Sequence, residues 1–261
     1  MLLRLLPALA TAAAIAVILV VGVTGGTAQT AERLPDLRQE LPTKIGVTGE
    51  RLGFASAVSN VGDGPLIVEG SRPRHAQPHM VAEQLVRRRG APHAVVERVG
   101  RLRYVRSADH EHWHLLPFMR YELRDAGPGA AVRRDRKTGF CLGDRYPVRG
   151  ERLPARARRE VYTSRCGLRA TGRLHLVQGI SVGFGDDYDA YLEGQSVSLR
   201  DLPAGRYVLV HRVNGGRRLR ETDYRNNAAS VLLRLSRRSG RARVQLIRRC
   251  PGRARCPRPP R

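Results

Sequence analysis

Three histidines spaced two residues apart, His110, His112 and His114, form the sharpest chemical signal in the chain. Alternate side chains of a strand share a face, so the three imidazoles are expected to project together. Neighbouring rings are then roughly 6.6 Å apart, and the outer pair about 13 Å apart on a flat strand. Ligation of one ion by all three therefore requires a twist or a bulge. Imidazole is a ligand for copper, zinc, iron or nickel. The alternative, a strand with solvated histidines, is disfavoured because three of the eight histidines fall within five residues.

Lysine is rare in this chain of 261 residues, although its formal net charge is +24. Only Lys44 and Lys137 are lysines, which leaves 45 arginines among the 47 basic residues. The arginines are spread along the chain without interleaved aromatic residues, so nucleic-acid binding is not favoured. A solvated cationic surface is the simpler interpretation. A lysine retained among so many arginines suggests chemistry that requires a primary amine.

Oxygen-bearing side chains gather near the end of the sequence. Glu221, Asp223, Asn226 and Asn227 fall within seven residues. Carboxylates and amide carbonyls at this spacing are hard ligands of the kind that calcium prefers. An Asx-rich turn that satisfies its own backbone explains the same pattern equally well.

The N-terminal sequence predicts an export signal or a membrane anchor. Residues 1–4 are positively charged, and residues 5–23 carry no charge. Small residues follow, which places a cleavage site near Ala28 to Ala31 and a signal peptide at residues 1–31. The uncharged run also reaches transmembrane length, about 20 residues, so an uncleaved anchor helix is the alternative. Both interpretations place the rest of the chain outside the cytoplasm.

Four cysteines are compatible with disulfides in an exported protein. Cys250 and Cys256 are six residues apart, with Pro and Gly between them, and are able to close a small loop near the C-terminus. Cys141 and Cys166 would then be left to pair with each other. Four cysteines allow three pairings, and the sequence alone does not choose among them.

The region after residue 50 predicts an all-β fold, a β-sandwich core with long loops. Short apolar segments alternate with Gly, Pro and Asn turns. Strands are expected at 52–58, 65–68, 94–96, 102–105, 196–199, 206–213, 228–235 and 242–247. One short helix is expected at 80–89 and a long surface loop at 144–177. Residues 32–248 are assigned to one domain, and 249–261 to a basic, Pro-rich tail with poor order beyond Ile247.

Several motifs, taken in order, resemble the catalytic domain of the lysyl oxidase family. Together they span about residues 34–235. They are Leu34–Leu37, Asn60–Leu66, the segment HEHWH with Phe118 and Tyr121–Leu123, Lys137–Asp144, Gln178–Gly183, Asp186–Tyr188, Leu202–Tyr207 and Glu221–Asn227.

The resemblance implies a copper-dependent amine oxidase. Copper would bind at the three histidines, and Lys137 and Tyr188 would form a lysine tyrosylquinone cofactor. Such an enzyme converts a primary amine, either a small amine or a peptidyl lysine, to an aldehyde with release of hydrogen peroxide and ammonia. The protein residues would position that cofactor. The base that would remove the α-proton of the substrate is not identified by the sequence; Asp186 and Asp187 are noted only because they lie close to Tyr188.

The same resemblance implies calcium at the later oxygen cluster. Asp36 and the Leu37 carbonyl would complete that site from the N-terminal segment. The basic surface favours substrates whose amine has acidic neighbours. The alternative function is a non-catalytic, metal-stabilised binding module of the cell envelope. The oligomeric state is not predicted.

Overall fold

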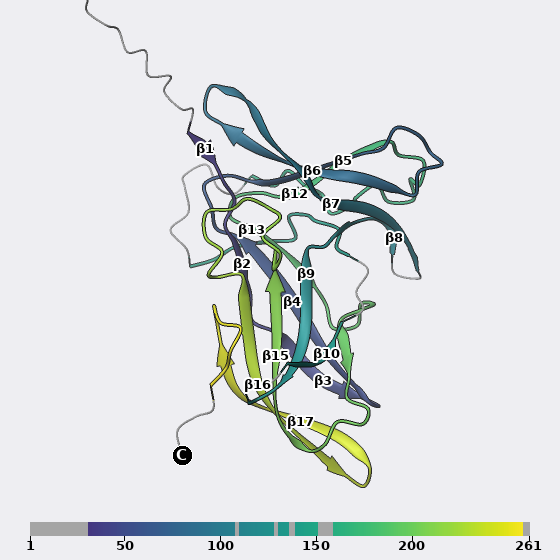
Figure 1. Cartoon of the computed structure of the whole chain (residues 1–261), viewed down its shortest axis with the longest axis vertical. Coiled ribbons are helices and arrows are strands. Elements are labelled where there is room, and N and C mark those ends of the chain that lie inside the picture. Colours follow the sequence, from purple (N-terminus) through teal and green to yellow (C-terminus); the bar gives the residue numbers. More distant parts are fainter. Residues whose placement is uncertain (1–30, 108–109, 128–129, 136–138, 151–158, 258–261) are drawn as a thin grey trace, which may run out of the picture.

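The computed structural model describes residues 31–107, 110–127, 130–135, 139–150 and 159–257. The described residues form seventeen strands and no helix, which confirms the all-β class (Figure 1). The expected signal or anchor helix at the N-terminus lies outside the described residues. Within the described part of the chain, no helix has the length and apolar character needed to cross a membrane.

The first sheet carries the histidine motif at one edge. Its strand order is β12-β5-β6-β7-β8, with β1 paired to β6, and every pairing is antiparallel. The strands are β1 (Glu32–Arg33), β5 (Leu66–Ser71), β6 (His79–Arg88), β7 (Ala91–Ser107), β8 (His110–Leu116) and β12 (His175–Ile180). This sheet lies at the upper end of the molecule in Figure 1.

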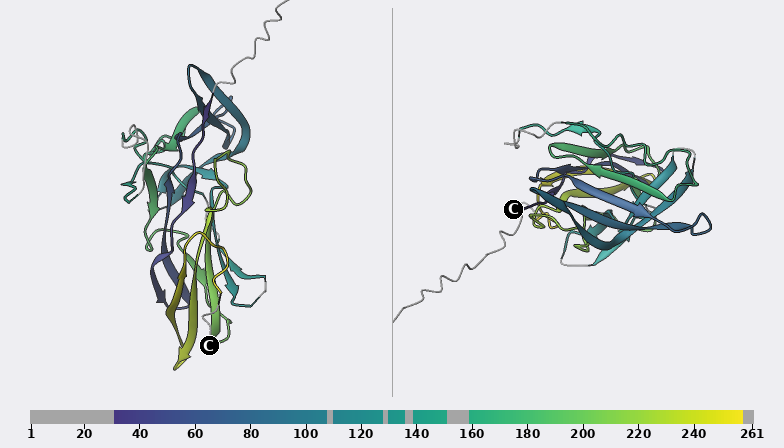
Figure 2. Two further views of the ribbon diagram at one scale, coloured as in Figure 1. Left: turned by 90° about the vertical axis from the view of Figure 1, so that its left-hand side faces the viewer. Right: turned by 90° about the horizontal axis from the view of Figure 1, so that it is seen from above.

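Two further sheets run below it, along the long axis of the molecule (Figure 2). One has the order β10-β9-β15-β16-β17 and the other β11-β13-β4-β14, with β2 and β3 also paired to β4. The first of these comprises β9 (Met119–Asp125), β10 (Ala131–Arg134), β15 (Gly205–Val213), β16 (Ala228–Arg238) and β17 (Arg241–Cys250). The second comprises β2 (Leu37–Gln39), β3 (Thr43–Thr48), β4 (Arg51–Asn60), β11 (Tyr146–Pro147), β13 (Phe184–Tyr188) and β14 (Ser196–Ser198).

The core lies between β4 and the facing strands β9 and β15. Phe54 of β4 meets the rings of Tyr121 and His211 at centroid distances of 4.9 and 4.6 Å. Successive side chains alternate across each strand, so the residues between these core positions face outward. The two sheets therefore pack face to face, which is the arrangement expected of a sandwich.

The expected helix at 80–89 is wrong, because this segment is strand β6. Met80, Ala82, Gln84 and Val86 are buried, and the residues between them are more exposed. That period of two belongs to a strand with one face on the core. The apolar residues alone were too few to separate this pattern from a helical one.

The C-terminal segment is better ordered than expected. Strand β17 continues to Cys250, and Cys250 and Cys256 are both buried against Val208, Val210 and Leu232. A disulfide joins the two cysteines, and a second joins Cys141 to Cys166. The short disulfide loop explains the order beyond Ile247, because it folds the chain back onto the outer face of β15 and β16.

Candidate metal centre

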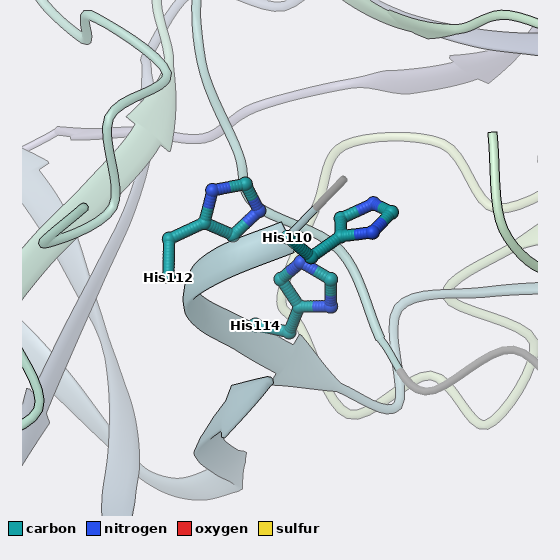
Figure 3. Close-up of side chains that lie close together, drawn as sticks. All are labelled: His110, His112 and His114. Carbon is teal, nitrogen blue, oxygen red and sulfur yellow. The ribbon is translucent and has the colours of Figure 1, made fainter. Parts of the chain in front are cut away.

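The three predicted histidines do converge. Their ligand nitrogens all lie within 4.8 Å of one another, and the ring centroids of His110 and His114 are 5.1 Å apart. Two nitrogens bound to one ion at 2.0–2.1 Å are at most about 4.2 Å apart, so small side-chain movements suffice for shared ligation. Figure 3 shows the rings gathered where the ribbon of β8 curves. This curvature brings the outer pair far closer than a flat strand allows.

The opposite face of β8 is anchored by Trp113, which is buried. Its ring nitrogen donates a hydrogen bond to the Ala170 carbonyl at 3.0 Å, and its backbone N–H donates to the Cys166 carbonyl at 2.9 Å. The Arg72 guanidinium lies 4.7 Å from the ring centroid. Anchoring one face of the strand holds the histidine-bearing face in place, because the two alternate along the same backbone.

The environment of the triad is mostly enclosed. His110 and His114 are buried, and His112 is half-buried. The hydroxyl of Ser107 lies 3.2 Å from Nδ1 of His110, and a carboxylate oxygen of Glu193 lies 3.9 Å from the same nitrogen. Three imidazole ligands would leave a further coordination position on an ion, as in catalytic metal sites with three protein ligands.

Tyr188 is a buried phenol with two acceptors. Its hydroxyl lies 2.6 Å from the Cys141 carbonyl and 2.6 Å from a carboxylate oxygen of Asp186. Burial and the negative charge of Asp186 raise the pKa of Tyr188 well above its ordinary value. The neutral phenol is thus held with its proton directed at acceptors.

The side chains of the two acidic residues before Tyr188 point in different directions. Asp186 is fully buried beside Tyr188. Asp187 is exposed and accepts a hydrogen bond from Arg145 at 2.9 Å. Alternation along β13 sends these neighbours to opposite faces, so only Asp186 faces the tyrosine.

One short segment links Tyr188 to the triad strand. Phe140 and Leu115 exchange backbone hydrogen bonds of 2.7 and 3.2 Å, which fixes residues 139–142 beside β8. The Phe140 ring lies 4.9 Å from that of Tyr188. A Cβ on Gly139 would lie 2.8 Å from the Cβ of His114, and its φ of +116° also favours glycine. Glycine therefore permits the segment to approach the triad.

Lys137 lies outside the described residues, so its predicted role stays a prediction. Gly139, two residues later, lies against His114. The other lysine, Lys44, forms an exposed ion pair with Asp189 at 2.8 Å. Asp189 follows Tyr188 directly, but its side chain is on the solvent side. Nothing in the sequence indicated that Lys44 would approach the same segment.

The predicted oxygen ligands also meet, although β2 and the later cluster are far apart in sequence. Asn226 donates a hydrogen bond to Asp36 at 2.7 Å, and Glu221 accepts from Asn227 at 2.5 Å. Leu37 contributes its N–H to Glu221 at 2.9 Å. Burial raises the pKa of Glu221 to about 7 and also raises that of Asp36. The four polar side chains therefore share one partly buried neighbourhood.

Two details of this cluster concern its fit to a cation. The side-chain oxygens of Asn226 and Asn227 are buried and have no hydrogen-bond partner within the described structure. Two carboxylates beside two amide oxygens match the hard ligand set of calcium. Asp223 instead faces Arg225, to which it is paired at 3.0 Å. Asn214, which sequence reasoning missed, donates to Glu221 at 2.6 Å.

His211 is a second residue that sequence reasoning missed. It is fully buried on β15, and burial lowers its pKa to about 3. Its ring packs 4.4 Å from that of Tyr121. Both ring nitrogens lack a hydrogen-bond partner in the described part of the chain. Because its ring is buried against Tyr121, we assign His211 to the core. Its neighbours along the strand are mostly apolar, so the sequence gave no reason to single it out.

Comparison with known proteins gives consistent matches. A family model described as lysyl oxidase matches residues 94–245, more than half of the chain. Lysyl oxidase homolog 1 of Homo sapiens is 31% identical over 119 residues, which are 45% of this chain and 18% of that protein. Protein-lysine 6-oxidase of Sus scrofa is 30% identical over 126 residues, 48% of this chain and 44% of that protein. The chain thus spans less than half the length of these relatives.

Proposed function

Because this chain belongs to the lysyl oxidase family, we propose that it is an exported copper amine oxidase of lysyl oxidase type. Its substrates are primary amines, either small amines or peptidyl lysine. Amine, dioxygen and water are converted to aldehyde, ammonia and hydrogen peroxide. The observation that carries the proposal is the convergence of three imidazoles on β8 beside the segment that contacts Tyr188.

His110, His112 and His114 would hold the copper ion, whose preference for imidazole they satisfy. Copper and a lysine tyrosylquinone formed from Lys137 and Tyr188 would supply the redox chemistry that no ordinary side chain provides. We assign the catalytic domain to residues 32–248, with the export signal at 1–31.

The protein's own groups hold the tyrosine and its proton. The Cys141 carbonyl and Asp186 fix the phenol oxygen, and Asp186 is the group placed to receive its proton. The Phe140 ring packs against the Tyr188 ring and keeps water from that side. The disulfide from Cys141 to Cys166 ties this segment to the loop that also anchors Trp113. These contacts hold the Tyr188 ring against the segment that pairs with β8.

Gly139 supports the pairing of Lys137 with Tyr188. It lies against His114, and Phe140 follows it directly against Tyr188. The chain therefore passes from the triad to the tyrosine within three residues of the lysine. A primary amine would be required for addition to the ring of Tyr188 once copper and dioxygen had oxidised that ring to a quinone, and arginine does not replace it.

We also propose that calcium binds between Asp36, Glu221, Asn226 and Asn227. The support is the pair of buried amide oxygens beside two carboxylates. The ion would join β2 to the segment that precedes β16, and so attach the N-terminal part of the domain to a late strand. Asp223 and the Leu37 carbonyl would join the ligand set after Arg225 and the local backbone adjust.

The oxidase proposal is tested by comparing Lys137→Arg with the matched control Lys44→Arg. Each is loaded with copper in air, and peroxide release is measured across a panel of primary amines. Reaction with a carbonyl reagent and mass spectrometry of tryptic digests report the cross-link. Wild type and Lys44→Arg are expected to release peroxide and to react with the reagent, whereas Lys137→Arg does neither.

Equal peroxide release from both variants would exclude Lys137 from the cofactor. Lys137 and Tyr188 peptides that stay separate and unmodified in copper-loaded wild type, with no reaction to the reagent, would favour the non-catalytic binding module instead.

A further inference from the structure

A large open groove lies beside the proposed site, on the outer face of β9 and β15. Its volume is about 1120 Å³. β7, the turn between β8 and β9, the end of β10 and the turn after β15 form its other walls. Gly139 and Phe140 also line it. The groove and the triad therefore share one wall, the segment that approaches His114 and Tyr188.

The lining of this groove carries an excess of positive charge. Six arginines line the groove, compared with only two acidic residues, Glu122 and Asp135. Glu122 is bridged by Arg124 at 2.6 Å and Arg134 at 3.6 Å. The other five arginines have no carboxylate within 4.0 Å among the described residues; they are Arg98, Arg101, Arg120, Arg212 and Arg218. Cations gathered around a concave surface concentrate the electrostatic field there.

Two of these arginines are held directly opposite each other. Arg120 of β9 and Arg212 of β15 are cross-strand partners. Their neighbours Tyr121 and His211 are also paired and pack inward, so alternation turns both arginines outward into the groove. Like charges directly opposite on adjacent strands destabilise a sheet. An anion that binds both guanidinium groups would remove that repulsion.

The shape and chemistry of the groove favour an acidic polypeptide. Phe118 and Phe140, its aromatic residues, are only 3% and 1% exposed, so they offer no stacking platform for nucleic-acid bases. Guanidinium groups bind carboxylates with paired hydrogen bonds. A chain seated in the groove would pass Gly139 and Phe140, which adjoin the proposed reaction centre.

We propose that this groove binds an acidic stretch of an amine-bearing polypeptide substrate. This inference rests on the proposed function only for the fate of the amine. Binding of the acidic stretch itself depends on the arginines alone. The amine of a lysine next to that stretch would be presented at the wall shared with the triad.

The first test measures binding without catalysis. The probe is a fluorescein-labelled, acetylated Glu/Asp peptide that contains no amine, and fluorescence anisotropy gives its Kd. The groove variant is Arg120→Gln with Arg212→Gln. The control variant, Arg241→Gln with Arg243→Gln, removes the same charge from exposed positions on β17. Melting temperatures confirm that each variant folds.

The groove variant is expected to bind about tenfold or more weakly, because each lost charge-assisted hydrogen bond has an effect of that size. The control variant is expected to change Kd less than about twofold, since the two charges that it removes lie outside the groove lining and are screened by salt. Wild-type binding should weaken as salt rises. Equal weakening in both variants, or no binding by wild type at low salt, would overturn the proposal.

The second test compares peroxide release from an acetylated peptide with a Glu-flanked lysine and from a small amine. The groove variant is expected to lose about tenfold in its preference for the peptide, by the same reasoning. The control variant should keep the wild-type preference. If wild type oxidises no amine at all, the proposed function fails, whereas the anisotropy result still decides the groove. A preference unchanged in the groove variant would overturn the link between groove and substrate.

Discussion

Replacement of His211 by leucine is expected to make the protein less sensitive to acid. His211 is buried between Phe54 and Tyr121, and burial lowers its pKa from 6.5 to about 3. The folded pKa lies below the unfolded value, so the unfolded chain binds this proton first as the pH falls. The stability that the neutral ring contributes is full above about pH 6.5 and is lost progressively toward pH 3.

The size of the effect follows from these two pKa values. At pH 5 the unfolded histidine is almost fully protonated, whereas the folded one remains neutral. The linkage relation gives a loss of about 2 kcal/mol in the free energy of unfolding between pH 7 and pH 5. Leucine does not titrate, so the variant should lose about 2 kcal/mol less than wild type over that interval.

Urea unfolding at pH 7 and pH 5 measures this difference, with fluorescence of the single tryptophan, Trp113, as the signal. Metal-free protein is used throughout, so that ion release does not contribute. His93→Leu is the matched control, because His93 is exposed. His211→Gln provides a second neutral replacement if leucine prevents folding. An equal loss of stability in wild type and in both His211 variants would refute the assignment of a buried neutral ring.

Two further predictions concern the proposed ions. His114→Ala should weaken copper binding by tenfold or more, because it removes one of the three proposed histidine ligands, whereas the exposed control His75→Ala should leave the affinity unchanged. Isothermal titration with copper measures both affinities. Equal affinities of the two variants would exclude the triad as the copper site. Calcium should raise the melting temperature of wild type, and chelation should reverse the rise, because a ligand bound only by the folded state stabilises it. Glu221→Gln should show a much smaller rise, and an equal rise in this variant would place any calcium elsewhere.

Local patterns predicted what depends on local geometry. The spacing of the three histidines placed them on one face, and Trp113 on the other, because side chains alternate along a strand. The strand character of 206–213 and 228–235 followed from short apolar runs and became β15 and β16. The prediction of a helix at 80–89 was wrong because it also used only the local pattern. A short apolar segment fits the period of a helix or of a strand until its partner strand is known.

Long-range packing determined the rest. The spacing of the histidines predicts neither the curvature of β8 nor the approach of Gly139 to His114. The buried position of His211 likewise depends on Phe54, which comes from another sheet. Such contacts follow from sheet packing, and a strand's own periodicity says only which face a residue occupies.

The separation of Asp186 from Asp187 shows how the fold resolves an ambiguity that the sequence leaves open. Both lie within two residues of Tyr188 along the chain. Pairing of β13 with β4 turns Asp186 toward the buried phenol and leaves Asp187 exposed. Arg145 lies 2.9 Å from Asp187 and 3.9 Å from Asp186. A carboxylate that receives a proton from Tyr188 must share its face of the strand. The arrangement of β13 therefore makes Asp186 the carboxylate that accepts the hydrogen bond of Tyr188, and it accounts for the salt bridge of Asp187 without assigning it a role in chemistry.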